Sequence, residues 1–401
     1  MNPTANKLAV QKPFLTALAL SLGAAISLGI SRFSYALLLP PMRDDLGWSY
    51  LLAGAMNTGN ALGYLLGALA TPFLMRRYGA QTALIGGSVL TGVFLLLSGF
   101  VIDDNALLLL RVLAGVASAF IFISGGVLAA RLGTLHAQRA GFLIGLYYSG
   151  IGLGIIASAL LVPEVLGAAG AQNAAHGWQW AWLGLGGLAL LATALMALPA
   201  YSIDGSVPAA PAGQRQFRVG AFGYGLVGYF LFGCGYIGYM TFIIALLKEQ
   251  GMQPSVITWF YTMLGVAVLL SSRVWAGMLD RFKGGESLAI LNGLLGVATV
   301  LPVLSAAPVA VFASGMLFGV VFVSLVASTT VLVRHNLPPH AWSSGISLFT
   351  TVFAFGQIVG PTLVGWISDG AGGLQRGLVI SALALFAGAV LAWRQKPLAK
   401  A

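Results

Sequence analysis

The chain alternates between long apolar runs and short polar connections. An α-helix needs about 20 predominantly apolar residues to cross the ~30 Å hydrocarbon core of a bilayer. Twelve runs approach or exceed that length, with approximate bounds 14–40, 50–74, 82–101, 106–130, 140–162, 179–200, 220–247, 256–279, 287–305, 309–333, 344–367 and 376–393. The pattern predicts an all-α integral membrane protein with twelve transmembrane helices.

The longest polar connection divides these runs into two equal sets. It covers residues 201–219 and contains Pro208, Pro211, Gly205 and Gly213. A segment rich in proline and glycine between two apolar regions is typical of a linker. We therefore predict three parts, namely an N-terminal six-helix bundle over 1–200, a cytoplasmic linker over 201–219 and a C-terminal six-helix bundle over 220–401.

Positive charge is distributed unevenly between the connections. With the N-terminus in the cytoplasm, fifteen of the 20 lysines and arginines fall at the inner face. Arg43, Lys248 and Arg376 fall outside, and Arg32 and Arg111 fall within spans. Because cytoplasmic loops are enriched in lysine and arginine, both termini are predicted to be cytoplasmic. The net charge of +10 then reports topology, and we expect no nucleic-acid partner.

Composition agrees with a membrane protein and excludes a soluble globular one. The chain is 58% hydrophobic and only 7% charged, whereas soluble domains carry about 25% charged residues. A single cysteine, Cys234, excludes an internal disulfide and CxxC metal sites. We find no cluster of histidine and acidic residues at membrane depth and no loop that would cradle phosphate. We therefore expect that the protein is not an enzyme and that it binds no cofactor and no metal ion.

Four motifs resemble those of the major facilitator superfamily. Residues 76–79 (RRYG) and 277–282 (GMLDRF) join the second to the third span and the eighth to the ninth. Residues 111–119 (RVLAGVASA) lie in the fourth span, and residues 356–361 (GQIVGP) in the eleventh. The chain is similar to a poorly characterised bacterial branch of that superfamily. The resemblance implies two pseudo-symmetric six-helix bundles, alternating access and a multi-pass position in a bacterial inner membrane.

The resemblance also implies which residues change conformation. The loop motifs and small-residue ridges indicate gating roles for Arg77, Gly79, Asp280, Arg281, Gly63, Gly360 and Pro361. The first loop departs from the family pattern, because Arg76 stands where an aspartate is usual. Static helix packing is the alternative interpretation of the glycine ridges, since small residues let membrane helices approach closely.

Two arginines lie inside apolar runs that contain no Asp, Glu, Lys or His. Insertion scales assign about 2.5–3.5 kcal/mol to an arginine at the centre of a membrane helix, so such a charge needs a partner or a use. Arg32 is on the first span and Arg111 on the fourth, and the resemblance places both helices at a central cavity. We predict that both bind an anion. The alternatives are that either one reaches lipid headgroups, or that Arg111 bonds to the backbone of the first span.

Aromatic and amide side chains complete the predicted binding site. Tyr35 lies one turn after Arg32, while Tyr229 and Tyr236 are seven residues apart and share one helical face. Further candidates are Tyr147 with its neighbour Tyr148 on the fifth span, and Gln357 on the eleventh. The alternative for each tyrosine is a place in the bundle core or at the membrane interface.

These observations predict a secondary active or facilitative transporter that moves a small organic solute, an organic anion, by alternating access. The alternatives are a multidrug or metabolite exporter with an aromatic cavity and structural arginines, and a solute sensor on the same fold. Because no acidic residue is buried in a span, coupling has three options: facilitated diffusion, anion exchange, or symport through a rim acid such as Asp44 or Asp45 or through the substrate itself. The expected partners are the solute and the lipid bilayer, and we expect a monomer.

Overall fold

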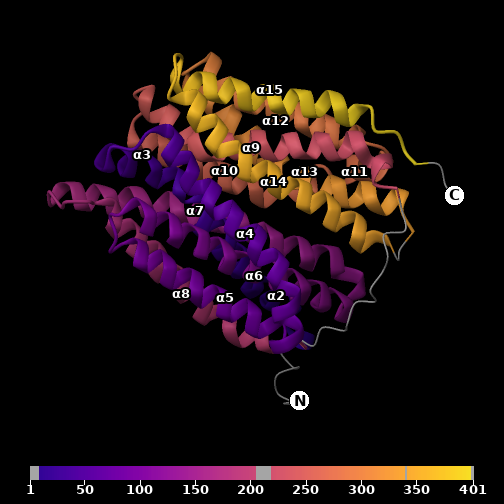
Figure 1. Ribbon diagram of the computed structural model, residues 1–401. Coiled ribbons are helices and arrows are strands. Elements are labelled where there is room, and N and C mark those ends of the chain that lie inside the picture. The colour runs from indigo at the N-terminus through magenta and orange to yellow at the C-terminus, as the bar shows by residue number, and fades with distance from the viewer. Residues whose placement is uncertain (1–8, 205–217, 339–340, 399–401) are drawn as a thin grey trace. The chain divides into compact units, whose positions relative to one another are not determined.

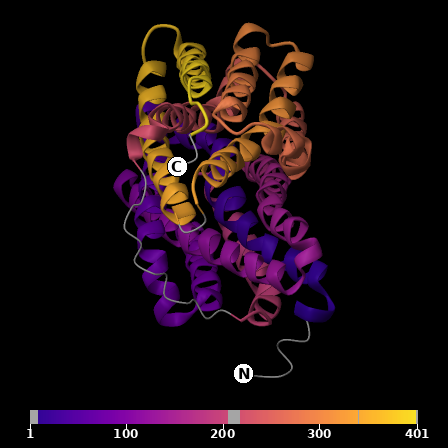
Figure 2. The same cartoon turned by 90° about the vertical axis from the view of Figure 1, so that its right-hand side faces the viewer.

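The computed structural model describes residues 9–204, 218–338 and 341–398, with the side chains of residues 272 and 343 left out. Helices joined by short connections make up almost all of this part of the chain (Figures 1 and 2). Within it, eleven helices are long and apolar enough to cross a membrane. The prediction of an all-helical membrane protein is confirmed to that extent. The predicted sidedness of the termini stays a prediction.

The predicted second span is present as a helix but does not belong to these eleven. It is α4 (Tyr50–Tyr78), 29 residues long. Its sequence carries Asn57 and Asn60 near the middle and Arg76 and Arg77 at the end, which makes it less apolar than the other spans. The count of twelve crossings therefore stays a prediction.

The chain forms two compact units. Unit 1 comprises Met1–Gly47 and Gly59–Ala209, and unit 2 comprises Trp48–Thr58 and Ala210–Ala401. The first turns of α4 thus group with unit 2, while the rest of that helix groups with unit 1. Most of the expected linker, residues 205–217, lies outside the described residues. The predicted bundle limits stay a prediction.

Unit 1 contains, besides most of α4, the elements α2 (Pro13–Ala24), η1 (Ala25–Phe33), α3 (Tyr35–Leu46), α5 (Ala80–Ser98), α6 (Asp104–Leu135), η2 (Ala137–Arg139), α7 (Ala140–Ala171) and α8 (Trp178–Tyr201). The elements α2 and η1 pack against α6, α7 and α8, and α5 packs against α6 and α8. The first span is therefore held on several sides by other helices of its own unit.

The predicted first span is divided at its centre. Ala25–Phe33 forms a π-helix, η1, and the N–H of Ser34, the residue after it, donates to the carbonyl oxygen of Gly29 at 3.1 Å. Gly29 meets α7 so closely that a Cβ there would lie 2.5 Å from Cα of Gly154. A side chain at Gly29 would separate the two helices. Short π-helical segments inside α-helices are frequent at functional sites, and this one carries Arg32.

Unit 2 contains η3 (Val219–Phe222), α9 (Gly223–Glu249), α10 (Pro254–Val274), α11 (Ala276–Arg281), α12 (Glu286–Leu304), α13 (Pro308–Asn336), α14 (Trp342–Ser368) and α15 (Gly373–Trp393). Within it α9 packs against α14 and α15, α12 packs against α15, and α10 packs against α13. Gly360 makes the contact of α14 with α9 close, because a Cβ there would lie 2.5 Å from the carbonyl oxygen of Cys234.

Candidate functional site

Arg32 lies in the last turn of the π-helix and is buried, with 3% of its surface exposed. Its Nε and Nη2 atoms have no hydrogen-bond partner among the residues that the structure describes. The guanidinium carbon lies 5.6 Å from the centre of the Tyr64 ring on α4. A cation–π contact of this kind offsets part of the cost of burying the charge but satisfies no N–H group. Arg32 therefore keeps unused donors inside unit 1.

Arg111 on α6 is equally buried but is bonded to the first span. Its Nη1 donates to the carbonyl oxygen of Ser31 at 2.8 Å. Its guanidinium carbon lies 4.8 Å from the ring centre of Tyr35 and 5.6 Å from that of Trp182. The backbone contact is the one given above as the alternative for Arg111. Its effect is to hold the residue that precedes Arg32.

A row of aromatic rings leads away from Arg32 within unit 1. The ring centres of Tyr64 and Phe122 are 6.5 Å apart, and those of Phe122 and Tyr148 are 5.4 Å apart. These three side chains are half-buried. Tyr147 lies beside them, with its ring 5.0 Å from that of Tyr148, but it is fully buried and its hydroxyl donates to the carbonyl oxygen of Phe122 at 2.8 Å.

Sequence reasoning placed Arg32, Arg111, Tyr35 and Tyr147 in the site, and the structure brings all four into unit 1. It missed Phe122 and gave Tyr64 no binding role. Tyr64 had a signal, because it lies one turn after Asn60 on the polar face of α4, the least apolar span. Their role in binding stays a prediction.

The candidates on α9 form an aromatic stack within unit 2. Tyr229 and Tyr236 are both buried, and the ring of Phe232 lies between them, 5.5 Å from one and 4.8 Å from the other. Phe353 on α14 stacks on the same rings at 4.9 Å from Tyr229 and 5.6 Å from Tyr236. Gln357 lies one turn after Phe353 and is buried. This stack is apolar apart from the phenol groups.

The predicted gating glycines pack against neighbours in their own unit. A Cβ at Gly63 would collide with the carbonyl oxygen of Val112 on α6, just as Gly360 meets α9. Pro361 follows inside α14. These contacts agree with the packing interpretation of the ridges, and a role in gating stays a prediction.

The predicted gating loops end helices. Gly79 has φ +85° between α4 and α5, a conformation that favours glycine. Nε of Arg77 donates to the hydroxyl of Tyr78 at 3.0 Å. Asp280 and Arg281 close the short helix α11, and the Arg281 guanidinium lies over the ring of Phe282. Their gating role stays a prediction.

The rim acid Asp45, at the end of α3, is already engaged in unit 1. Its Oδ2 atom lies 2.6 Å from Nδ1 of His176 and accepts a hydrogen bond from Nε1 of Trp178 at 2.5 Å. Asp44 lies 3.5 Å from Nη1 of Arg43. Asp45 thereby ties the end of the first span to the start of α8.

The start of α4 is held on unit 2 by Asp369, at the end of α14. Its carboxylate accepts hydrogen bonds from the backbone N–H groups of Tyr50 at 2.7 Å and Leu51 at 2.8 Å. The Tyr50 hydroxyl donates to the Glu249 carboxylate, and Asn57 donates to Thr241 at 2.7 Å. Asp369 therefore caps α4 from far along the chain.

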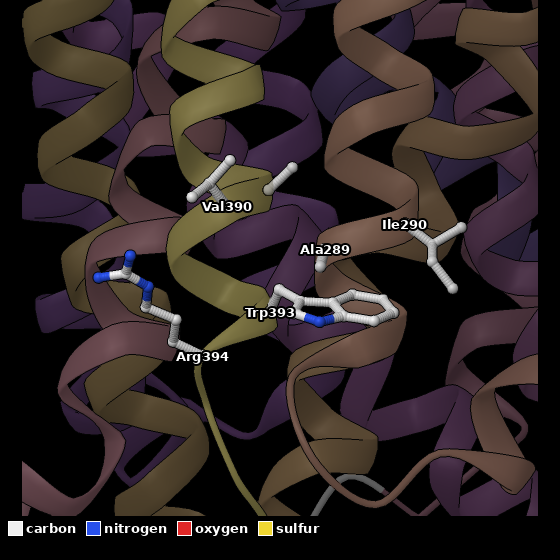
Figure 3. A pocket seen from close by; sticks show the side chains of 6 residues that line it. Ala289, Ile290, Val390, Trp393 and Arg394 are labelled. Carbon is white, nitrogen blue, oxygen red and sulfur yellow. The ribbon is translucent and has the colours of Figure 1, made fainter.

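A surface groove between α12 and α15 has a different character (Figure 3). It is lined mostly by apolar side chains, with Trp393 and Arg394 at the end of α15 and Ala289 and Ile290 on α12. Trp393 is 62% exposed. Tryptophan and arginine at a helix end are typical of the membrane–water interface, so we assign this groove to the lipid-facing surface.

Comparison with known proteins adds the family and the relatives. Residues 24–393 match the family described as "Uncharacterised MFS-type transporter YbfB", where MFS stands for major facilitator superfamily. The chain is 27% identical over 370 residues to the 3-(3-hydroxy-phenyl)propionate transporter of Escherichia coli (strain K12), covering 85% of this chain and 84% of that one. It is 25% identical over 323 residues to monocarboxylate transporter 13 of Bos taurus, covering 79% and 73%.

Solved structures of transporters share the fold. A bacterial homolog of the human lysosomal transporter Spinster, in an inward-facing and unoccupied conformation, matches with a TM-score of 0.73 at 15% identity, covering 95% of this chain and 97% of that one. The nucleoside transporter NupG matches with a TM-score of 0.67 at 16% identity, covering 98% of both chains. At these identities the likeness shows the fold alone.

Proposed function

Because the chain belongs to the major facilitator superfamily of transporters, we propose that it is a secondary transporter that carries a small organic anion across a bacterial inner membrane by alternating access. In this proposal the chain crosses the membrane twelve times, has both termini in the cytoplasm, and works as a monomer. Arg32 is the anion anchor, and Arg111 positions the turn that carries it.

The unpaired edge of the Arg32 guanidinium carries this proposal. A buried donor without a partner costs about 1–3 kcal/mol, and more when it is charged. An anion that enters the site supplies acceptors and opposite charge, and the attraction is stronger at low dielectric than in water. The printed names of the two curated relatives also support the proposal, because monocarboxylates and hydroxyphenylpropionate are carboxylates.

The experiment is uptake of radiolabelled organic acids into proteoliposomes that contain the purified protein. Arg32→Lys keeps the positive charge but removes the planar pair of donors, so we expect uptake to fall at least about tenfold, equivalent to roughly 1.4 kcal/mol. The matched control is Arg139→Lys, which alters an exposed arginine in η2. Full activity and unchanged acid selectivity in Arg32→Lys would exclude the anchor role.

A multidrug exporter is the second candidate, favoured by the aromatic stack around Tyr229 and Tyr236 and by the structural contact of Arg111. This candidate predicts that the protein transports lipophilic cations and that the Arg32→Lys substitution does not change the rate of that transport. A thermal-shift screen of organic acids, amino acids and lipophilic cations separates the two functions. Stabilisation by acids that disappears in Arg32→Ala supports the anion transporter, and stabilisation by cations alone supports the exporter.

A further inference from the structure

We propose that the anion is an aryl carboxylate, with its carboxylate on Arg32 and its ring among Tyr64, Phe122 and Tyr148 of unit 1. The inference rests on the proposed function and narrows it from organic anions to one class. It is carried by two neighbouring features, the unpaired edge of the guanidinium and the row of half-buried rings that begins over it.

The proposed position of the solute's carboxylate follows from the two Arg32 atoms that lack hydrogen-bond partners. Nε and Nη2 lie along one edge of the planar guanidinium, and both are buried without a hydrogen bond among the described residues. The two oxygens of a carboxylate match such an edge in a pair of parallel hydrogen bonds. Ser31, the residue before Arg32, is held by Arg111, which keeps that turn in place. The site therefore presents a preorganised edge to a planar anion.

The ring end follows from the exposure of the aromatic side chains. Tyr64 lies over the guanidinium, Phe122 packs on Tyr64, and Tyr148 packs on Phe122, from α4, α6 and α7 respectively. All three rings are half-buried, so each keeps surface that a guest could cover, whereas Tyr147 behind them is fully buried. Aromatic rings whose centres lie about 4.5–7 Å apart attract one another beyond the effect of burial alone.

The two features together select one chemical class. An aliphatic acid would satisfy Arg32 and leave the rings uncovered, while a neutral aromatic solute would leave the guanidinium unpaired. A lipophilic cation would bring like charge to Arg32. A solute with a carboxylate joined to an aromatic ring meets both requirements. Each ring contact is worth roughly two- to tenfold in affinity, which sets the preference over an aliphatic acid of the same charge.

The first test uses the unaltered protein in proteoliposomes. The probes are 3-phenylpropionate, its neutral amide 3-phenylpropionamide, and propionate. We expect half-maximal uptake of 3-phenylpropionate at a concentration at least tenfold below that for propionate, and no competition by the amide. Equal uptake of the two acids overturns the aryl class and leaves the anion transporter standing. Uptake of neither acid overturns the aryl class, and the anion transporter is overturned as well when no acid in the uptake experiment described above is carried.

The second test locates the ring. Phe122→Leu removes an aromatic face and keeps an apolar side chain of similar size, so we expect it to lower the preference for 3-phenylpropionate over propionate about five- to tenfold while propionate uptake persists. Phe73→Leu is the control, because Phe73 is on α4 and 63% exposed. An unchanged preference in Phe122→Leu overturns the proposed ring position. If that variant fails to fold, Tyr148→Leu makes the same comparison.

Discussion

The carbonyl oxygen of Ser31 accepts a hydrogen bond from Nη1 of Arg111, 2.8 Å away. This contact joins α6 to the π-helix at the residue before Arg32. Two arginines that are equivalent as intramembrane charges in the sequence therefore differ in structure. Arg111 uses a donor in a hydrogen bond between two helices, whereas the adjacent Nε and Nη2 donors of Arg32 have no partner among the described residues.

Replacing each arginine by methionine should affect stability differently. Arg111→Met removes a charged hydrogen bond, so we expect the free energy of unfolding to fall by about 1.5–3 kcal/mol. Arg32→Met removes a buried charge with unpaired donors and keeps the side-chain volume, so stability should be unchanged or higher. Thermal unfolding in detergent without substrate measures both. An equal loss in the two variants would mean that Arg32 is structural as well.

Two glycines on α7 form a matched pair for testing helix contacts. A Cβ at Gly150 would collide with the carbonyl oxygen of Ser21, whereas a Cβ at Gly141 meets nothing within 4 Å. We expect Gly150→Ala to lower stability by about 1–3 kcal/mol through overpacking. Gly141→Ala should be neutral or stabilising by about 0.5–1 kcal/mol, because alanine suits a helix better. The measurement is the unfolding temperature of each variant. Equal values for the two variants would contradict the close approach of α7 to α2.

Asp369 should control the order of the first turn of α4. Asp369→Ala removes the acceptor of the Tyr50 and Leu51 N–H groups, a loss of capping worth about 0.5–2 kcal/mol. We expect faster amide hydrogen exchange in residues 48–58. Glu164→Ala alters an exposed acid on α7 and is the control, with no change expected in that peptide. Unchanged exchange in Asp369→Ala would exclude the cap in solution.

The predicted topology can be tested with the single cysteine removed. In a Cys234→Ser background, Arg376→Cys should react with a membrane-impermeant maleimide in intact cells, because that position is expected outside. Arg139→Cys and Arg76→Cys should react only after the membrane is permeabilised, because both positions are expected in the cytoplasm. Labelling of Arg139→Cys in intact cells would contradict the orientation predicted from the distribution of positive charges.

The candidate site was only partly accessible to sequence reasoning. Arg32 and Arg111 could be found because a charge inside an apolar run is visible in one dimension. Phe122 could not, since an aromatic residue on an apolar span looks the same whether it faces lipid, a neighbouring helix or a solute. Its place beside Tyr64 and Tyr148 depends on the rotation of three helices about their axes.

By itself the sequence determined that the chain is helical and apolar enough for many membrane crossings, because backbone polar groups in lipid must be satisfied within each segment. It also determined where the two costly charges lie along the chain. Only the tertiary structure decided that α2 and α3 are separated by a π-helix, that Arg111 bonds to Ser31, and that Arg32 keeps unpaired donors beside a row of rings. Those features depend on which groups of different helices approach one another. The hydrophobic pattern of a sequence does not determine the distances between groups on different helices.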